Sequence, residues 1–171
     1  MLRGIILNRL AAAERALGEP LDYLRYVVRA STALFLRIAY LSPVHWKRKR
    51  LPADAYYTAV IVACRHEDCG TCVQTVVNLA RQDGVAAEKL RTVLDRRPAA
   101  LGADVEAVYR FATAVLENTG EEGEFREALS ERYGDEGIVE LAMAITRGRF
   151  YPTLKRSLGY ATSCALVEVR V

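Results

Sequence analysis

Hydrophobic residues recur every three or four positions along almost the whole chain, which is the spacing of one face of an α helix. This spacing predicts helices over residues 2–17, 21–41, 53–65, 71–82, 86–96, 104–118, 124–133, 138–148 and 151–169. Gly and Pro separate several of these segments, as in Gly18-Glu19-Pro20. Alternation typical of a strand is confined to residues 166–171, which are too few to build a sheet. The pattern therefore predicts an all-α fold.

Charge divides the chain into two parts. Residues 1–50 contain ten Lys or Arg and three Asp or Glu, a net charge of +7, so the other 121 of the 171 residues sum to −4. We therefore predict a basic N-terminal helical extension over residues 1–50 and a helical domain over residues 51–171. The chain is long enough to bury a core without disulfide staples.

The N-terminal extension has two open interpretations. Arg25, Arg29 and Arg37 lie beside a wide apolar face, so this helix either packs on protein or lies on an anionic membrane surface. We favour packing on the body or on another subunit, with peripheral membrane contact as the alternative. The basic run over residues 47–50 has no nucleic-acid-binding motif, so we predict a solvated linker and no nucleic-acid partner.

From the apolar segments we expect neither a secretory signal nor a membrane span. Arg3 and Arg9 interrupt its first apolar segment, and three arginines interrupt the most apolar stretch, residues 23–46. Three of the four cysteines lie within nine positions, which is typical of redox or metal chemistry in a reducing compartment. We therefore expect a cytoplasmic protein.

The candidate chemistry lies in Cys69-Gly70-Thr71-Cys72. Asp68 is a good N-cap for a helix that begins at Cys69 or Gly70, and the N-terminus of a helix stabilises a thiolate. The residues alone leave three interpretations open: a thiol pair that forms a disulfide reversibly, a buried structural pair, or a zinc site completed by Cys64 and His66. We favour the thiol pair, with no metal and no cofactor. Cys64 and His66 point about 200° apart on a helix, so both cannot face one ion.

Residues 51–165 resemble the AhpD-like branch of the carboxymuconolactone decarboxylase family. The resemblance rests on the small apolar segment YYTAVIVA, the Cys69-x-x-Cys72 pair, a following helix that ends at Gly84, and the downstream segment YGDEGIVELAMAITRGRFYPTLKRSLGYATSC. It implies an AhpD-like helical bundle that assembles as trimers or larger homo-oligomers. It also implies peroxidase or disulfide-reductase chemistry, in which the second cysteine, Cys72, attacks and Cys69 resolves. Helix electrostatics alone favour Cys69 as the more acidic thiol.

The chain departs from the proton relay of AhpD, which places a Glu twelve residues before the first cysteine and a His four residues after the second. Tyr57 and Val76 stand at these positions. His66, three residues before Cys69, is a candidate replacement base, because an imidazole can accept a thiol proton or stabilise a thiolate. The catalytic residues that we predict are therefore Cys69, Cys72 and His66.

Together these observations predict a thiol-dependent oxidoreductase that reduces hydroperoxides or disulfides through a reversible Cys69–Cys72 disulfide. Its partners would be a small hydroperoxide or disulfide substrate, a dithiol electron donor and further copies of itself. The alternative is a non-catalytic oligomeric helical module, in which the cysteine pair is a redox switch or a metal clip.

Overall fold

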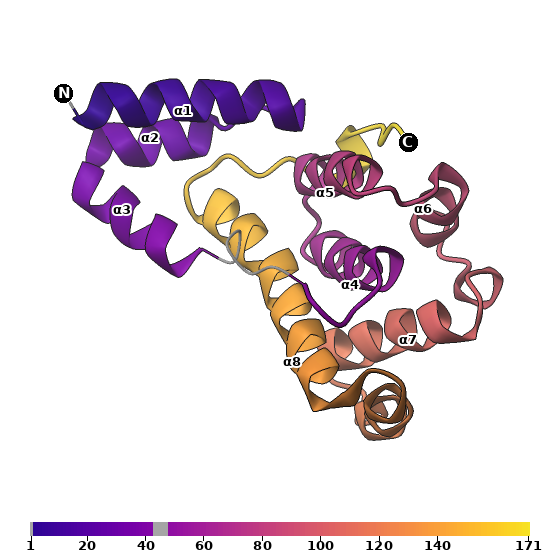
Figure 1. The fold of residues 1–171 in the computed structure, drawn as a ribbon. Helices are drawn as coiled ribbons and strands as arrows, with labels where there is room; N and C mark the ends of the chain where they lie inside the picture. The colour runs from indigo at the N-terminus through magenta and orange to yellow at the C-terminus, as the bar shows by residue number, and fades with distance from the viewer. Residues whose placement is uncertain (1, 43–47) are drawn as a thin grey trace.

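The computed structural model describes residues 2–42 and 48–171. In these residues the chain forms α helices and 3-10 turns without a strand, which confirms the predicted all-α class (Figure 1). The α helices are α1 (Leu2–Leu17), α2 (Asp22–Ala30), α3 (Thr32–Leu41), α4 (Ala53–His66), α5 (Gly70–Gln82), α6 (Ala87–Leu94), α7 (Ala103–Glu117) and α8 (Glu122–Ser157). Short 3-10 turns lie at Pro98–Ala100 and Cys164–Leu166. Across this described part of the chain, no helix is both long and apolar enough to cross a bilayer.

The body of the molecule is built around α4, which packs against α5, α7 and α8 (Figure 1). Ala55, Ala59 and Ala63 follow one another at four-residue intervals on α4 and are fully buried, so neighbouring helices approach this face closely. At the α4–α8 contact, a Cβ added to Gly148 would lie 2.7 Å from the carbonyl oxygen of Val60. The crossing of these two helices therefore requires glycine at position 148.

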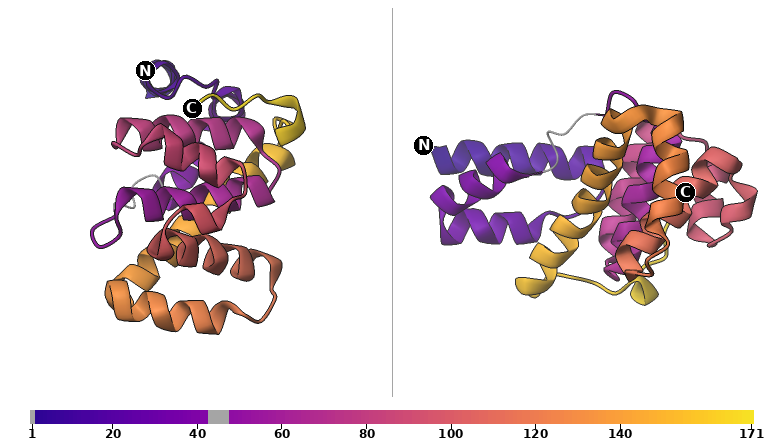
Figure 2. Two further views of the ribbon diagram at one scale, coloured as in Figure 1. Left: turned by 90° about the vertical axis from the view of Figure 1, so that its right-hand side faces the viewer. Right: turned by 90° about the horizontal axis from the view of Figure 1, so that it is seen from below.

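Helices α1, α2 and α3 form a separate layer on one side of the body (Figure 2). They form a second, smaller core together with the C-terminal end of α8. The buried residues of this core are Ile6, Leu10, Leu21, Tyr23 and Val28, and the side chains of Tyr151, Leu154 and Leu158 pack against them. An ion pair between Glu14 and Arg25 joins α1 to α2. The amide of Asn78 on α5 donates to the carbonyl of Leu17 over 2.7 Å, which joins the layer to the body.

The prediction of one helix over residues 21–41 was wrong, because the chain breaks at Ser31. This residue has extended backbone angles, and its hydroxyl accepts a hydrogen bond from the backbone N–H of Leu34, so it caps a new helix. A serine side chain competes with the backbone for hydrogen bonds, which favours a cap over continuation. Within α3, no residue is buried.

The C-terminal third also differs from the predicted segments. Helices were predicted over residues 124–133, 138–148 and 151–169, whereas α8 is bent only at Gly134, with φ of 69°, and then continues through Pro152 to Ser157. Beyond Gly159, with φ of 76°, the chain has only the short 3-10 turn. The predicted helix to residue 169 was therefore wrong, because the backbones of Thr162 and Arg170 make hydrogen bonds with α5, and the residues between them form only the 3-10 turn.

The basic run is held against the body where the structure describes it. Lys47 lies outside the described residues, whereas Arg48 pairs with Asp83 over 2.8 Å and Arg50 pairs with Glu136 over 2.7 Å. The buried carboxylate of Glu140 accepts from three consecutive backbone N–H groups, those of residues 49–51. These contacts position the start of α4.

Candidate functional site

Cys69 and Cys72 lie at the start of α5 and are joined by a disulfide, with their Cα atoms 5.2 Å apart. Cys69 is the N-cap of α5, and Cys72 lies in its first turn. The predicted cap, Asp68, does not cap α5. It has a positive φ of 49°, and its carboxylate accepts from the backbone N–H of Cys164 over 2.8 Å. That hydrogen bond lowers the pKa of Asp68, so the side chain stays ionised. The carboxylate therefore holds the C-terminal tail through Cys164.

The two sulfurs have different surroundings. Cys69 is fully buried, and the C-terminal tail packs beside it, because the N–H of Gly70 donates to the carbonyl of Thr162 over 2.9 Å. A Cβ at Gly70 would lie 2.6 Å from the side chain of Val167, so the tail approaches this turn closely. Gln74 extends the contact, since its side chain both donates to and accepts from the backbone of Arg170.

Cys72 lines a cavity of about 690 Å³ between the α1–α3 layer and helices α4, α5 and α8. Thr75, Val76 and Leu79 line it with Cys72, because these positions share one face of α5. Most of the other lining residues are apolar. Cys64 of α4 also lines the cavity, but burial raises the pKa of this thiol to about 12, so it stays protonated at neutral pH.

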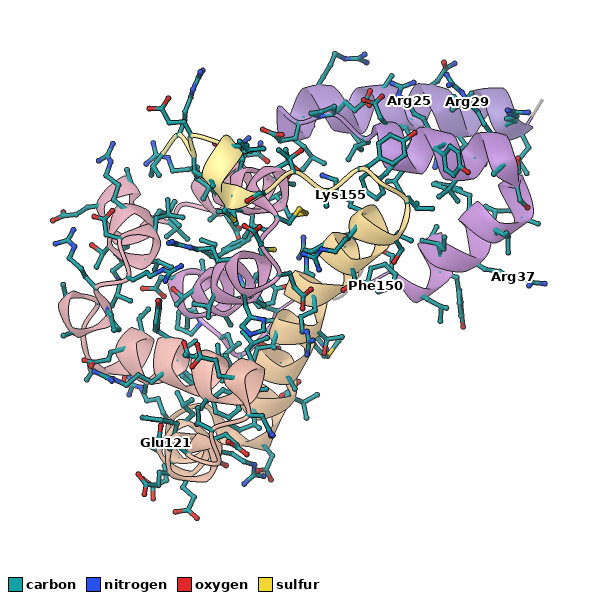
Figure 3. The ribbon with its side chains drawn as sticks, turned by 180° about the vertical axis from the view of Figure 1, so that it is seen from behind. Arg25, Arg29, Arg37, Glu121, Phe150 and Lys155 are labelled. Carbon is teal, nitrogen blue, oxygen red and sulfur yellow. A yellow bond between two sulfur atoms is a disulfide. The ribbon has the colours of Figure 1, made fainter. Side chains whose placement is uncertain are left out.

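A hydrogen-bonded chain leads from Cys69 to a buried lysine. The hydroxyl of Thr71 lies 3.8 Å from Sγ of Cys69, and Nζ of Lys155 donates to the same hydroxyl over 2.7 Å. Lys155 is 7% exposed and lies between α8 and α2, where its ammonium is 5.2 Å from the ring centroid of Tyr23 (Figure 3). Burial lowers the pKa of Lys155, and the negative charge of Glu19 opposes this effect only in part.

Glu67 fixes the turn that precedes the cysteines. Its buried carboxylate accepts from Arg149 over 2.9 Å and from Arg156 over 3.2 Å, and Arg156 also donates to the backbone carbonyl of Glu67. Burial raises the pKa of Glu67, but the hydrogen bonds from the two arginines outweigh burial, so the net shift is downward. The carboxylate therefore holds the end of α4 against α8 as an anion.

The structure brings together only some of the predicted site residues. Cys69 and Cys72 are adjacent, whereas His66 is exposed at the end of α4 and makes no hydrogen bond or ion pair with the residues that the structure describes. Of the two positions where the family's relay would lie, Val76 lines the cavity and Tyr57 is buried in the core. Burial raises the pKa of Tyr57, which keeps this phenol neutral.

Sequence reasoning missed Lys155 and Glu67. Lys155 is the only lysine in residues 51–171 apart from Lys89, and an isolated charge in a segment predicted as helix was a weak signal. Thr71 lies inside the cysteine motif, but its role depends on Lys155, which is 84 residues away.

The described residues contain no group of three or more His, Cys, Asp or Glu side chains that could hold a metal ion. Two of the four residues of the zinc alternative, Cys69 and Cys72, are bonded to each other. Comparison of the chain with models of protein families, with curated proteins and with solved structures found no match.

Proposed function

We propose that the protein is a thiol-dependent oxidoreductase, similar in chemistry to the AhpD-like proteins, that reduces hydroperoxides or disulfides through the Cys69–Cys72 disulfide. The observation that supports this most directly is the different placement of the two sulfurs. Cys72 lines an apolar cavity that can admit a substrate, whereas Cys69 is buried behind it and adjoins Thr71. The rate of thiol chemistry depends on access to the reacting sulfur, and this arrangement favours Cys72 as the sulfur that meets a substrate.

In the oxidising half of the cycle, the thiolate of Cys72 attacks a hydroperoxide that enters the cavity. A sulfur–oxygen bond forms, the oxygen–oxygen bond breaks, and the alkoxide leaves as an alcohol with the proton of the Cys72 thiol. Cys69 then attacks the sulfenic sulfur, a disulfide forms, and water leaves with the proton of the Cys69 thiol. The two thiols are oxidised and the hydroperoxide is reduced by two electrons.

In the reducing half, a dithiol donor attacks Sγ of Cys72 from the cavity, and Cys69 leaves as a thiolate. Because the hydroxyl oxygen of Thr71 accepts a hydrogen bond from Lys155, its O–H is available to donate a hydrogen bond to that thiolate. The donor's second thiol then displaces Cys72, so the donor becomes the disulfide. With a disulfide substrate the same steps run in reverse, because thiol–disulfide exchange is reversible. We therefore assign the stabilisation of the Cys69 thiolate to Thr71 and Lys155, while a role for His66 as a base stays a prediction.

The test is the consumption of cumene hydroperoxide by the full-length protein with dithiothreitol as reductant, and of a model aromatic disulfide in parallel. We expect turnover that Cys72→Ser and Cys69→Ser each abolish. Cys164→Ser is the matched control, because Cys164 is a free cysteine away from the cavity lining, and this variant should keep full activity. If neither substrate is consumed faster than with the Cys72→Ser variant, the pair is not a catalyst and the redox-switch alternative takes its place.

A further inference from the structure

The cavity beside Cys72 carries positive charge as well as an apolar wall. Lys155, Arg147 and Arg9 line it, whereas no Asp or Glu is among the described lining residues. None of these three cations forms an ion pair within the described part of the chain. Arg147 instead donates to the hydroxyl of Tyr56 over 2.9 Å. Arg9 is exposed and Arg147 is half-buried, so only Lys155 is a buried cation, and a buried charge is usually paired because an unpaired one costs free energy.

Lys155 is the most informative of the three. More than nine-tenths of it is buried, and its ammonium has three N–H donors, of which only one has a hydrogen-bond acceptor among the described residues, the hydroxyl of Thr71. Glu19 acts on it only through its charge, since the two side chains form no ion pair within the described part of the chain. The ring of Tyr23, whose centroid is 5.2 Å from the ammonium, faces it with π electrons and supplies no oxygen acceptor, so the other two donors are available to an acceptor within the cavity that Lys155 lines.

The rest of the lining suits a hydrocarbon. Ile6, Leu10, Leu24, Phe35 and Leu79, from four different helices, line the cavity together. A volume of about 690 Å³ is in the range of sites that enclose a small organic ligand. Such a site combines a large apolar surface with a few polar groups that orient the ligand.

We infer that the cavity binds an aliphatic monocarboxylate of the fatty-acid class. Its carboxylate accepts hydrogen bonds from the ammonium of Lys155, and its hydrocarbon chain lies along the apolar side chains of α1, α2 and α3. The carboxylate supplies the negative charge that the cavity wall lacks. This site goes beyond the proposed redox function and does not depend on it, because binding requires no reaction at the cysteines.

Isothermal titration of the full-length, oxidised protein with decanoate tests the inference, with hexanoate and 1-decanol as the comparison ligands. We expect decanoate to bind with one site per chain. Affinity should fall about four-fold for each methylene removed, because each contributes hydrophobic free energy. Replacement of the carboxylate by the hydroxyl of decanol should weaken binding by about ten-fold or more, since hydrogen bonds to charged groups are the stronger ones.

Single substitutions distinguish the contribution of the Lys155 charge to binding from that of the cavity volume. Lys155→Met should weaken decanoate binding and leave decanol binding unchanged, whereas Lys49→Met, at an exposed lysine outside the cavity, should change neither. Ala13→Phe, which fills the cavity from α1 and keeps Lys155, should weaken both ligands. Cys72→Ser should still bind decanoate, even if it abolishes turnover.

Three results would overturn the inference. Equal affinity for decanoate and decanol would remove the carboxylate site. Unchanged binding in both Lys155→Met and Ala13→Phe would place the ligand elsewhere. Failure to bind decanoate would remove the site altogether, and sedimentation on phosphatidylglycerol vesicles in that case would assign the basic N-terminal layer to a membrane surface instead.

Discussion

Nζ of Lys155 donates a hydrogen bond to the hydroxyl of Thr71 over 2.7 Å, although the two residues are 84 positions apart in the chain. Thr71 lies between the two cysteines of the motif, so this contact brings a buried positive charge to the disulfide. The contact depends on the packing of α8 against the start of α5. A positive charge here favours a thiolate at Cys69. Tyr57 and Val76, at the positions of the family's relay Glu and His, carry no charge that could do so.

Lys155→Met should slow the reduction of the Cys69–Cys72 disulfide by about ten-fold or more, because a hydrogen bond to a charged group contributes about 1.5–3 kcal/mol. The Cys69 thiolate would lose this support, so in the reduced protein the pKa of the Cys69 thiol should also rise, which the pH dependence of the ultraviolet absorbance of the thiolate measures. Lys49→Met is the control. A slower rate without a change in this thiol pKa would reduce Lys155 to a packing role.

Cys69→Ser protein treated with one equivalent of hydroperoxide should accumulate a sulfenic acid at Cys72 that dimedone labels. The thiol of Cys72 lines the cavity, and the resolving thiol is then absent. Cys72→Ser should remain unlabelled at Cys69, which is fully buried. Peptide mass spectrometry locates the label, and the opposite pattern would make Cys69 the attacking sulfur.

Glu67→Gln should destabilise the protein at pH 7 by about 1–3 kcal/mol, because two arginines lose a carboxylate partner. The folded-state pKa of Glu67 is lowered, so its stabilisation is present above the unfolded-state value of about 4.5 and is lost as the pH falls through the folded-state pKa. Urea unfolding of wild type and variant should therefore converge in acid. Glu106→Gln, which alters an exposed i,i+4 pair with Arg110, should cost less than about 0.5 kcal/mol at either pH.

Gly148→Ala should destabilise the protein by about 1–3 kcal/mol, because the added methyl group would overlap the backbone of α4 at Val60. Gly123→Ala is the matched control in the same helix. Position 123 is exposed with no atom near a new Cβ, so alanine there should be neutral or stabilise by up to about 1 kcal/mol. Thermal unfolding distinguishes the two, and equal melting temperatures would contradict the close α4–α8 crossing.

Helix α3 should contribute to a homo-oligomer, because its apolar side chains are exposed on this chain. Leu34 is 52% exposed and Tyr40 is 87% exposed. A double change of Leu34→Glu and Tyr40→Glu should lower the mass measured by analytical ultracentrifugation. Arg37→Gln is the control on the same helix. An unchanged mass in the double variant would remove α3 from any subunit interface.

Local sequence determined the all-α class and most helix positions. The apolar spacing set α1 over Leu2–Leu17 and placed α4, α5 and α7 within a residue of their observed ends. It also identified Cys69 and Cys72 as a pair, since two cysteines separated by two residues at the start of a helix lie within reach of each other. Such features depend on neighbours in the chain, so the residues alone carry them.

Tertiary structure decided what the cysteines face. No local pattern indicates that Cys72 would line a cavity between α5 and the α1–α3 layer. Nor does any local pattern indicate that the tail would pack against Gly70 or that Lys155 would donate a hydrogen bond to Thr71. Even the end of α8 depended on distant contacts, because the tail makes hydrogen bonds with α5 in place of helical ones. Long-range packing chooses among conformations that are nearly equal in local free energy, and the surroundings of the reactive sulfurs follow from that choice.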